Sequence, residues 1–213
     1  KQIRSFRGSA SEISHLEFNH AGKSILSLSR DGTWMTWDVA SGKMKNKMKP
    51  AEDRFTFASF SPDGSMIATG SRKSGISTWN AETGEKILDF KPVPRNLYSE
   101  NGFDYPESGT VTFSTDGQFI IAGVGDNTAI LFDAKTGKEV SKFKKTNSTC
   151  TSCICEAVIT PDNKYILIAQ SDSVKMFERL TGEMVREFYG QGGTPENLTV
   201  SADNKYISAI EYG

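Results

Sequence analysis

The sequence predicts an all-β fold built from four-stranded antiparallel sheets that stack face on face around an axis. Three markers repeat in one register along the 213 residues. An aromatic residue followed by a polar or acidic one recurs with gaps of 42, 53 and 45 residues, at Trp37-Asp38, Trp79-Asn80, Phe132-Asp133 and Phe177-Glu178. A Ser/Thr-Gly pair recurs with the same gaps, at Ser41-Gly42, Thr83-Gly84, Thr136-Gly137 and Thr181-Gly182, and an upstream turn such as Asp63-Gly64 keeps step with both. Periods of about 40 to 45 residues are typical of stacked sheet repeats.

Each repeat contains four short runs with strand composition. In the first repeat these runs are 13–18, 23–29, 33–38 and 43–48, bounded by Gly, Asp, Asn or Ser residues that favour tight turns. The pairing must be antiparallel, because a parallel crossover needs about a dozen residues or more. Since one four-stranded blade cannot shield both of its faces, we expect successive blades to cover one another.

The repeat strings resemble the WD-repeat β-propeller family over nearly the whole chain, for example Phe60-Ser61-Pro62-Asp63-Gly64 and Ile76-Ser77-Thr78-Trp79-Asn80. Within a single region, 1–213, four complete blades are expected at about 8–48, 51–90, 109–143 and 150–188. Residues 1–6 match a fourth strand, strand d, and 196–210 match strands a and b of a further blade. We therefore expect a propeller fragment, belonging to a ring like the usual seven-bladed one, whose flanking blades come from further sequence or another chain. The alternative is a fifth, three-stranded blade made from the first and last strands.

The resemblance also implies a buried hydrogen-bond network in each blade, joining a His before strand a, a Ser/Thr on strand b, an Asp in the b–c turn and a Trp on strand c. The matching residues are Ser27, Asp31 and Trp37 in the first blade, Thr69 and Trp79 in the second, and the turn acids Asp126 and Asp172 in the later two. Ser9 stands where the His would be, Lys73 replaces the second Asp, and Phe replaces Trp in the last two blades. We expect packing, more than this network, to stabilise the blades.

Composition excludes several function classes. The 25 Lys+Arg nearly cancel the 26 Asp+Glu, which argues against a nucleic-acid binder or a polybasic membrane anchor. No apolar run approaches the ~18 residues of a membrane span. The three cysteines, Cys150, Cys153 and Cys155, are too local for a disulfide framework and indicate a reducing, cytoplasmic location, although two N-x-S/T triplets at Asn147 and Asn197 point weakly to secretion. A zinc site is the alternative interpretation of the cysteines, but no fourth ligand is evident. We expect no metal and no cofactor.

A basic strip is predicted on the face that carries the b–c turns and the loops between blades. Arg30 and Arg72 hold equivalent places before two b–c turns, and Lys73 and Arg54 are expected nearby. The planar guanidinium group of arginine binds carboxylate or phosphate through two parallel hydrogen bonds, so an acidic or phosphorylated peptide fits this strip. The alternative is that these are ordinary solvated charges.

A second candidate surface is the loop from Lys91 to Ser108, which contains roughly 11 extra residues. It carries three aromatic residues, Tyr98, Phe103 and Tyr105. Exposed aromatics are frequent interface anchors, but these could equally pack onto the blades as a plug.

The resemblance implies a non-catalytic scaffold that presents its turns to partner proteins. Two alternatives remain open. One is a structural component of a filament or coat lattice. The other is a propeller hydrolase with a central metal, for which the residues at the strand-a entries, Ile13, Phe55, Thr110 and Ile154, are poor ligands.

Overall fold

A computed structural model describes residues 5–9, 11–49, 54–71, 75–90, 110–123, 128–144, 156–170, 173–190 and 194–212. All regular elements within these ranges are β-strands. No helix in the described ranges is long and apolar enough to cross a membrane. The chain divides into two compact units, Lys1–Pro92 (unit 1) and Val93–Gly213 (unit 2).

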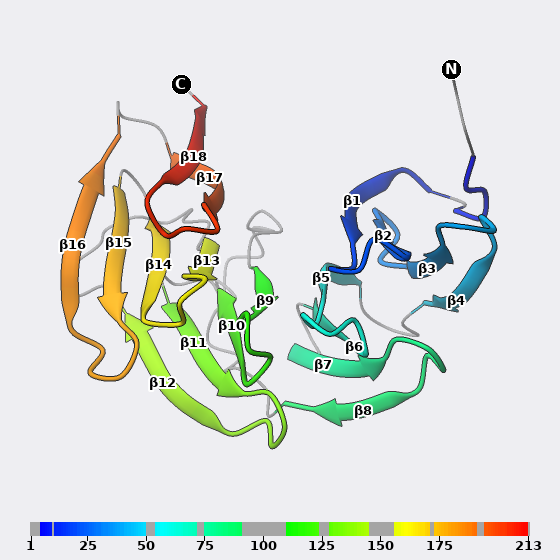
Figure 1. Ribbon diagram of the computed structural model, residues 1–213, viewed down its shortest axis with the longest axis horizontal. Coiled ribbons are helices and arrows are strands. Elements are labelled where there is room, and N and C mark those ends of the chain that lie inside the picture. Colours follow the sequence, from blue (N-terminus) through cyan, green and yellow to red (C-terminus); the bar gives the residue numbers. More distant parts are fainter. Residues whose placement is uncertain are drawn as a thin grey trace, which may run out of the picture. The chain divides into compact units, whose positions relative to one another are not determined.

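Unit 1 contains two four-stranded antiparallel sheets with the strand orders β1-β2-β3-β4 (blade 1) and β5-β6-β7-β8 (blade 2) (Figure 1). Their bounds are β1 Ile13–Phe18, β2 Ser24–Ser29, β3 Trp34–Asp38, β4 Met44–Met48, β5 Phe55–Phe60, β6 Met66–Ser71, β7 Gly75–Asn80 and β8 Lys86–Asp89. Each strand pairs with the next along the chain, as short turns require.

Unit 2 contains two further four-stranded sheets, β9 to β12 (blade 3) and β13 to β16 (blade 4), and a two-stranded sheet, β17-β18. Their bounds are β9 Val111–Phe113, β10 Phe119–Gly123, β11 Thr128–Asp133, β12 Glu139–Lys144, β13 Glu156–Ile159, β14 Tyr165–Gln170, β15 Ser173–Glu178, β16 Met184–Tyr189, β17 Thr194–Val200 and β18 Ile207–Tyr212. The predicted all-β class with four-stranded antiparallel blades is confirmed.

The two ends of the predicted region differ in regularity. The trailing pair of strands, expected within 196–210, is observed as β17 and β18. Of the expected leading strand 1–6, the described residues Ser5 and Phe6 lie outside any strand. Phe6 instead packs the edge of its ring against Trp37 of blade 1, with the centroids 6.0 Å apart. The number of blades in the complete ring stays a prediction.

The sequence markers correspond to one irregularity that every blade shares. The last two strands of each blade shift register by a bulge directly before the marker aromatic, at Thr36/Trp37, Thr78/Trp79, Leu131/Phe132 and Met176/Phe177. In blade 1, Oδ1 of Asp38 accepts hydrogen bonds from the backbone N and the hydroxyl of Ser41, and Gly42 takes a φ of 71°. Glycine adopts this left-handed backbone without steric cost. The aromatic, the acid and the Ser/Thr-Gly pair therefore specify one bulged hairpin.

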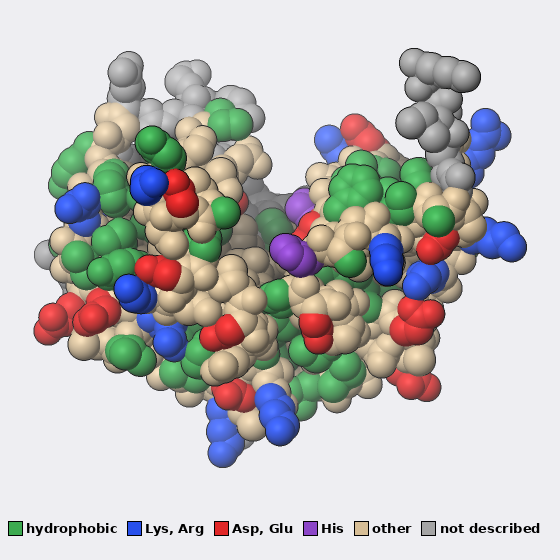
Figure 2. All heavy atoms as spheres, viewed as in Figure 1, with side chains coloured by type: hydrophobic (Ala, Val, Ile, Leu, Met, Phe, Trp, Pro, Cys, Tyr) green, Lys and Arg blue, Asp and Glu red, His purple; other side chains and the backbone are tan. Residues whose placement is uncertain are grey.

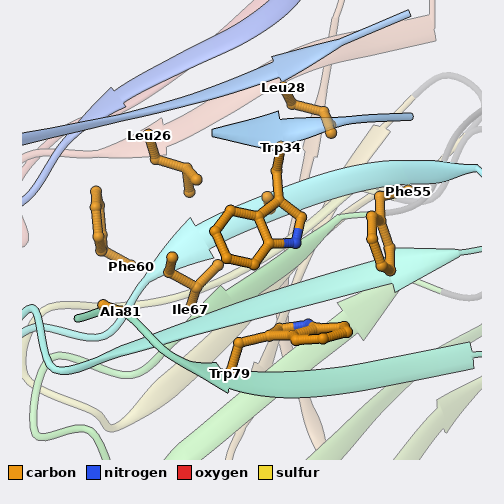
Figure 3. Packing of buried hydrophobic residues seen from close by; sticks show 9 residues of the cluster. Leu26, Leu28, Trp34, Phe55, Phe60, Ile67, Trp79 and Ala81 are labelled. Carbon is orange, nitrogen blue, oxygen red and sulfur yellow. The ribbon is translucent and has the colours of Figure 1, made fainter. Parts of the chain in front are cut away.

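Apolar residues between the two blades form the core of unit 1 (Figure 3). Leu26, Leu28 and Trp34 of blade 1 face the Phe55 and Trp79 side of blade 2. Trp79 makes edge contacts with Trp34 and Phe55, at centroid distances of 5.9 and 5.6 Å. Such pairs contribute about 0.5–1.5 kcal/mol beyond the area that they bury. Packing between neighbouring sheets thus completes the hydrophobic core, as the repeat argument predicts.

Unit 2 repeats this arrangement twice. One cluster joins blades 3 and 4 and includes Leu131, Phe143 and Ile166, with Phe177 packed against it. A second cluster joins blade 4 to the β17-β18 sheet through Leu167 and Leu198. Each sheet of unit 2 is therefore covered by its sequence neighbour.

Candidate interaction surface

Two residues of the predicted basic strip, Arg30 and Arg54, lie within the described residues. Arg30 follows β2, and its Nε lies 3.2 Å from Oε2 of Glu12. The backbone N of Arg30 also donates to the backbone O of Glu12, at 2.8 Å. Both side chains are more than two-thirds exposed, so their attraction is screened and contributes little to stability. Arg30 can therefore exchange Glu12 for another carboxylate at small cost.

Gly32 brings Arg54 against the β2–β3 turn. Its φ is +80°, and a Cβ placed on Gly32 would lie only 2.7 Å from the Cα of Arg54. No side chain fits at such a distance, so this close approach requires glycine. The structure thus places the backbone of Arg54 next to the turn that follows Arg30.

Asp31 adds negative charge to the same turn. Its Oδ1 accepts hydrogen bonds from the hydroxyl of Ser29 (2.7 Å) and the backbone N of Thr33 (3.1 Å), and Lys49 lies 3.8 Å from its Oδ2. The Ser29 hydrogen bond is the main reason that the pKa of Asp31 lies below its usual value. The described part of the strip therefore carries both signs, and Figure 2 shows the two signs interspersed over the visible face.

The remaining predicted site residues lie outside the described residues. They are Arg72 and Lys73 of the basic strip, Tyr98, Phe103 and Tyr105 of the aromatic loop, the turn acids Asp126 and Asp172, and the cysteines Cys150, Cys153 and Cys155.

The structural residues of the first two blades form the expected tryptophan contacts. Trp37 Nε1 donates to the hydroxyl of Ser27 at 2.9 Å, and Trp79 Nε1 donates to the hydroxyl of Thr69 at 2.8 Å. All four residues are buried, where an unpaired indole N–H would be costly. Asp31 does not join this pair, because its carboxylate is bound by its own turn. In blade 1 the expected network is therefore divided in two: the buried Trp37–Ser27 hydrogen bond, and the separate hydrogen bonds of Asp31 within the β2–β3 turn.

Glu17 on β1 makes a contact between blades that the sequence analysis did not single out. Its carboxylate accepts the backbone N–H of Phe60 at 3.1 Å and lies 3.3 Å from the hydroxyl of Ser59, both on β5. Burial raises the pKa of Glu17 to about 7, although these two hydrogen bonds lower it. His15, with its Nε2 4.0 Å from the Glu17 carboxylate, has a pKa lowered by burial. Glu17 therefore ties the first strands of adjacent blades in a partly desolvated place.

Related ties recur in unit 2. The hydroxyl of Thr110, just before β9, accepts the N–H of Ala157 on β13 at 2.9 Å. The carboxylate of Glu156 on β13 accepts the N–H of Leu198 on β17 at 2.9 Å. Thr110 and Glu156 stand four residues before the Ser/Thr that opens each β-turn, at Ser114 and Thr160, so this spacing is the sequence signal for them.

The described residues bring together no group of three or more His, Cys, Asp or Glu side chains of the kind that holds a metal ion.

Comparisons with known proteins follow the same repeats. The family described as "WD domain, G-beta repeat" matches residues 1–38, 47–80 and 109–133. The chain is 25% identical over 200 residues to a WD repeat-containing protein 26 homolog of Arabidopsis thaliana, covering 92% of this chain and 31% of that protein. It is 23% identical over 215 residues to a guanine nucleotide-binding protein subunit beta of Nicotiana tabacum, covering 99% of this chain and 56% of that protein. It is 24% identical over 172 residues to the Set1 complex component swd2 of Schizosaccharomyces pombe, covering 78% of this chain and 46% of that protein.

The chain thus spans between about a third and somewhat more than half of these relatives. The matched segments contain the marker pairs Trp37-Asp38, Trp79-Asn80 and Phe132-Asp133, and the structure shows that these markers specify the bulged hairpin common to its blades. The resemblance noted in the sequence is therefore confirmed: this chain carries repeats of the WD-repeat family.

Proposed function

We propose that this chain is a non-catalytic scaffold that presents its turns to partner proteins within a larger assembly. The observation that carries the proposal is that the chain carries repeats of the WD-repeat family. Two of its relatives are named as a guanine nucleotide-binding protein subunit and a Set1 complex component, which are parts of assemblies. The inter-blade cores and strand-a ties support this role, because a rigid framework holds exposed turns in fixed positions at low entropic cost.

The β2–β3 turn is the proposed contact surface in unit 1. Arg30 is exposed and, among the residues that the structure describes, its side chain is held by a screened pair with Glu12, and Arg54 is fixed beside the turn by the close approach of Gly32. A partner carboxylate or phosphate can replace Glu12 and bind the Arg30 guanidinium in a planar, bidentate fashion. We therefore propose acidic or phosphorylated segments as partners of this turn, with Arg72 and Lys73 kept as predicted members of the basic strip. Tyr98, Phe103 and Tyr105 stay a separate predicted surface.

Affinity purification with quantitative mass spectrometry tests this function. Arg30→Glu is expected to lower the recovery of at least one partner about tenfold or more, as loss of a charge-assisted bidentate contact does. Lys43→Glu is the matched control, because it makes the same charge change in the β3–β4 turn, at the other end of blade 1. Circular dichroism checks that both variants fold. If the wild type recovers no partner, the scaffold function is wrong. If Arg30→Glu and Lys43→Glu leave the same partners, the proposed surface is wrong.

We also propose a cytoplasmic location, in keeping with the few and clustered cysteines. Cell fractionation followed by immunoblotting tests it, and recovery of the protein in a secreted fraction would contradict it.

A further inference from the structure

A small pocket with a mixed polar and apolar lining, which includes Phe60, opens between the two blades of unit 1, at the end that carries the β5–β6 and β7–β8 turns. It has a volume of about 210 Å³. Its lining includes Ser24, Thr36 and Lys45 from blade 1 and Gly64, Ala81 and Glu82 from blade 2. The pocket lies wholly within unit 1, away from the β2–β3 turn at the other end of blade 1.

The repeat shows what belongs in this position, because unit 2 contains the equivalent place between blades 3 and 4. Ser24 begins the second strand of its blade, as Phe119 does in blade 3. Ala81 directly follows the third strand of its blade, as Arg179 does in blade 4. The backbone confirms the second equivalence, since Ala81 N donates to Ser65 O and Arg179 N donates to Lys164 O, each at 2.9 Å.

In unit 2 this place is filled by a guanidinium. The Cζ of Arg179 lies 4.5 Å from the centroid of the Phe119 ring, and Arg179 Nε donates to the carbonyl oxygen of Asn163 at 2.6 Å. Gly64 is the counterpart of Asn163, because both take a positive φ in the turn between the first two strands of a blade. In unit 1, Ser24 and Ala81 stand at the positions of the ring and the guanidinium, and both line the pocket.

The acceptors for a guanidinium remain in the pocket. Among the described residues, none donates a hydrogen bond to the carbonyl oxygen of Gly64 or pairs with the hydroxyl of Ser24. The Glu82 carboxylate lies at the rim, 2.7 Å from Lys45 Nζ, and its side chain is 76% exposed. The Lys45 side chain is 31% exposed, so the pair is partly open to solvent, and such pairs contribute little to stability. A guanidinium offers five N–H donors in a planar fork, which matches a carbonyl, a hydroxyl and a carboxylate better than an ammonium does.

We propose that this pocket receives the guanidinium of an arginine side chain carried by a partner protein. The chemistry follows from the internal comparison with Arg179. Only the source of the arginine, a partner protein, rests on the scaffold function proposed above. The pocket is thus a second contact point, opposite in charge preference to the Arg30 turn.

A pentapeptide with one central arginine between capped glycines is the probe, followed by amide chemical shifts of the full chain. It is expected to shift the Gly64, Ser65 and Glu82 amides with a Kd on the order of 1 mM, as suits one side chain in a small site. The same peptide with lysine is expected to bind several-fold more weakly, because it lacks the planar fork. Equal binding of the two peptides, or no shifts at these amides, overturns the proposal.

Two variants make the test specific. Ala81→Arg is expected to fill the pocket in the manner of Arg179 and to weaken peptide binding at least about tenfold, as steric exclusion from a small site does. Glu82→Gln leaves the pocket open but removes the rim carboxylate, and it is expected to weaken binding several-fold with the fold unchanged. If Ala81→Arg does not fold, the Glu82→Gln result decides. Undiminished binding by Glu82→Gln and by any folded Ala81→Arg overturns the proposal.

This result is separable from the scaffold function. Failure of the peptide to bind leaves the partners recovered by affinity purification intact. Absence of any recovered partner refutes the scaffold while leaving the peptide shifts unchanged.

Discussion

Replacing Glu17 by Gln gives the most direct test of how the blades of unit 1 are joined. Burial raises the pKa of Glu17 from its usual 4.5 to about 7. Below pH 4.5 the folded and unfolded chains both carry the proton, so the full stability is present. As the pH rises from 4.5 through 7, the unfolded chain loses the proton first, and the folded state is progressively destabilised. Glutamine keeps the uncharged form at every pH.

The size of the effect follows from the shift. The rise of the pKa from 4.5 to about 7 corresponds to roughly 3 kcal/mol. The Glu17 side chain keeps 31% of its surface exposed, so solvent screens part of this energy, and we expect about 1–2 kcal/mol. Glu17→Gln should therefore be more stable than the wild type by this amount at pH 8, with the advantage disappearing near pH 4.5.

Urea unfolding at pH 4.5, 6 and 8 measures this difference in free energy of unfolding. His15 is the neighbouring titratable group, and a His15→Gln background separates its contribution. Glu183→Gln, in an exposed turn of unit 2, is the matched control for the loss of one carboxylate. If Glu17→Gln is equally or less stable than the wild type at pH 8, the carboxylate is favourably ionised in its tie to Phe60 and the reasoning is wrong.

Two further predictions concern buried contacts in unit 1. Thr69→Val removes the acceptor of the Trp79 indole N–H at nearly constant volume, so unfolding free energy should fall by about 1–3 kcal/mol in urea titrations; a loss below 0.5 kcal/mol, roughly the scatter of neutral surface changes, would count against the buried pair. Gly32→Ala should destabilise more than Gly22→Ala when both are compared by thermal unfolding, because both have positive φ but only Gly32 lies against the backbone of Arg54. Equal melting temperatures would mean that this close approach is not rigid.

The sequence predicted the blades well because each one depends on local chemistry. Trp37-Asp38 and the following Ser41-Gly42 form one bulged hairpin, whose contacts lie within a single repeat. Short turns then leave only one antiparallel order of strands. A signal repeated in register at four places specifies the architecture even when Phe132 replaces Trp.

The contacts between blades were less predictable. Glu17 on β1 and Thr110 just before β9 are ordinary polar residues, and their roles depend on backbone N–H groups of the next repeat, 43 and 47 residues later along the chain. The split of Asp31 away from Ser27 and Trp37 likewise depends on which hydroxyl lies nearest in three dimensions. The four-residue spacing before the turn marks the positions of Thr110 and Glu156, but nothing in the sequence marks which amide each side chain meets.

The hydrogen bonds made by Thr110 and Glu156 run in one direction along the chain, from an earlier repeat to the next. In each case a side chain from the earlier repeat caps an amide of the later one. A repeat moved elsewhere in the array therefore supplies the side-chain acceptor for the repeat that follows it. Its own amide, however, depends on an acceptor from the repeat that now precedes it. Duplication or exchange of whole repeats should therefore give a folded array only when the preceding repeat offers an acceptor at this position. The order of the repeats, and not only their number, then limits how such arrays can change.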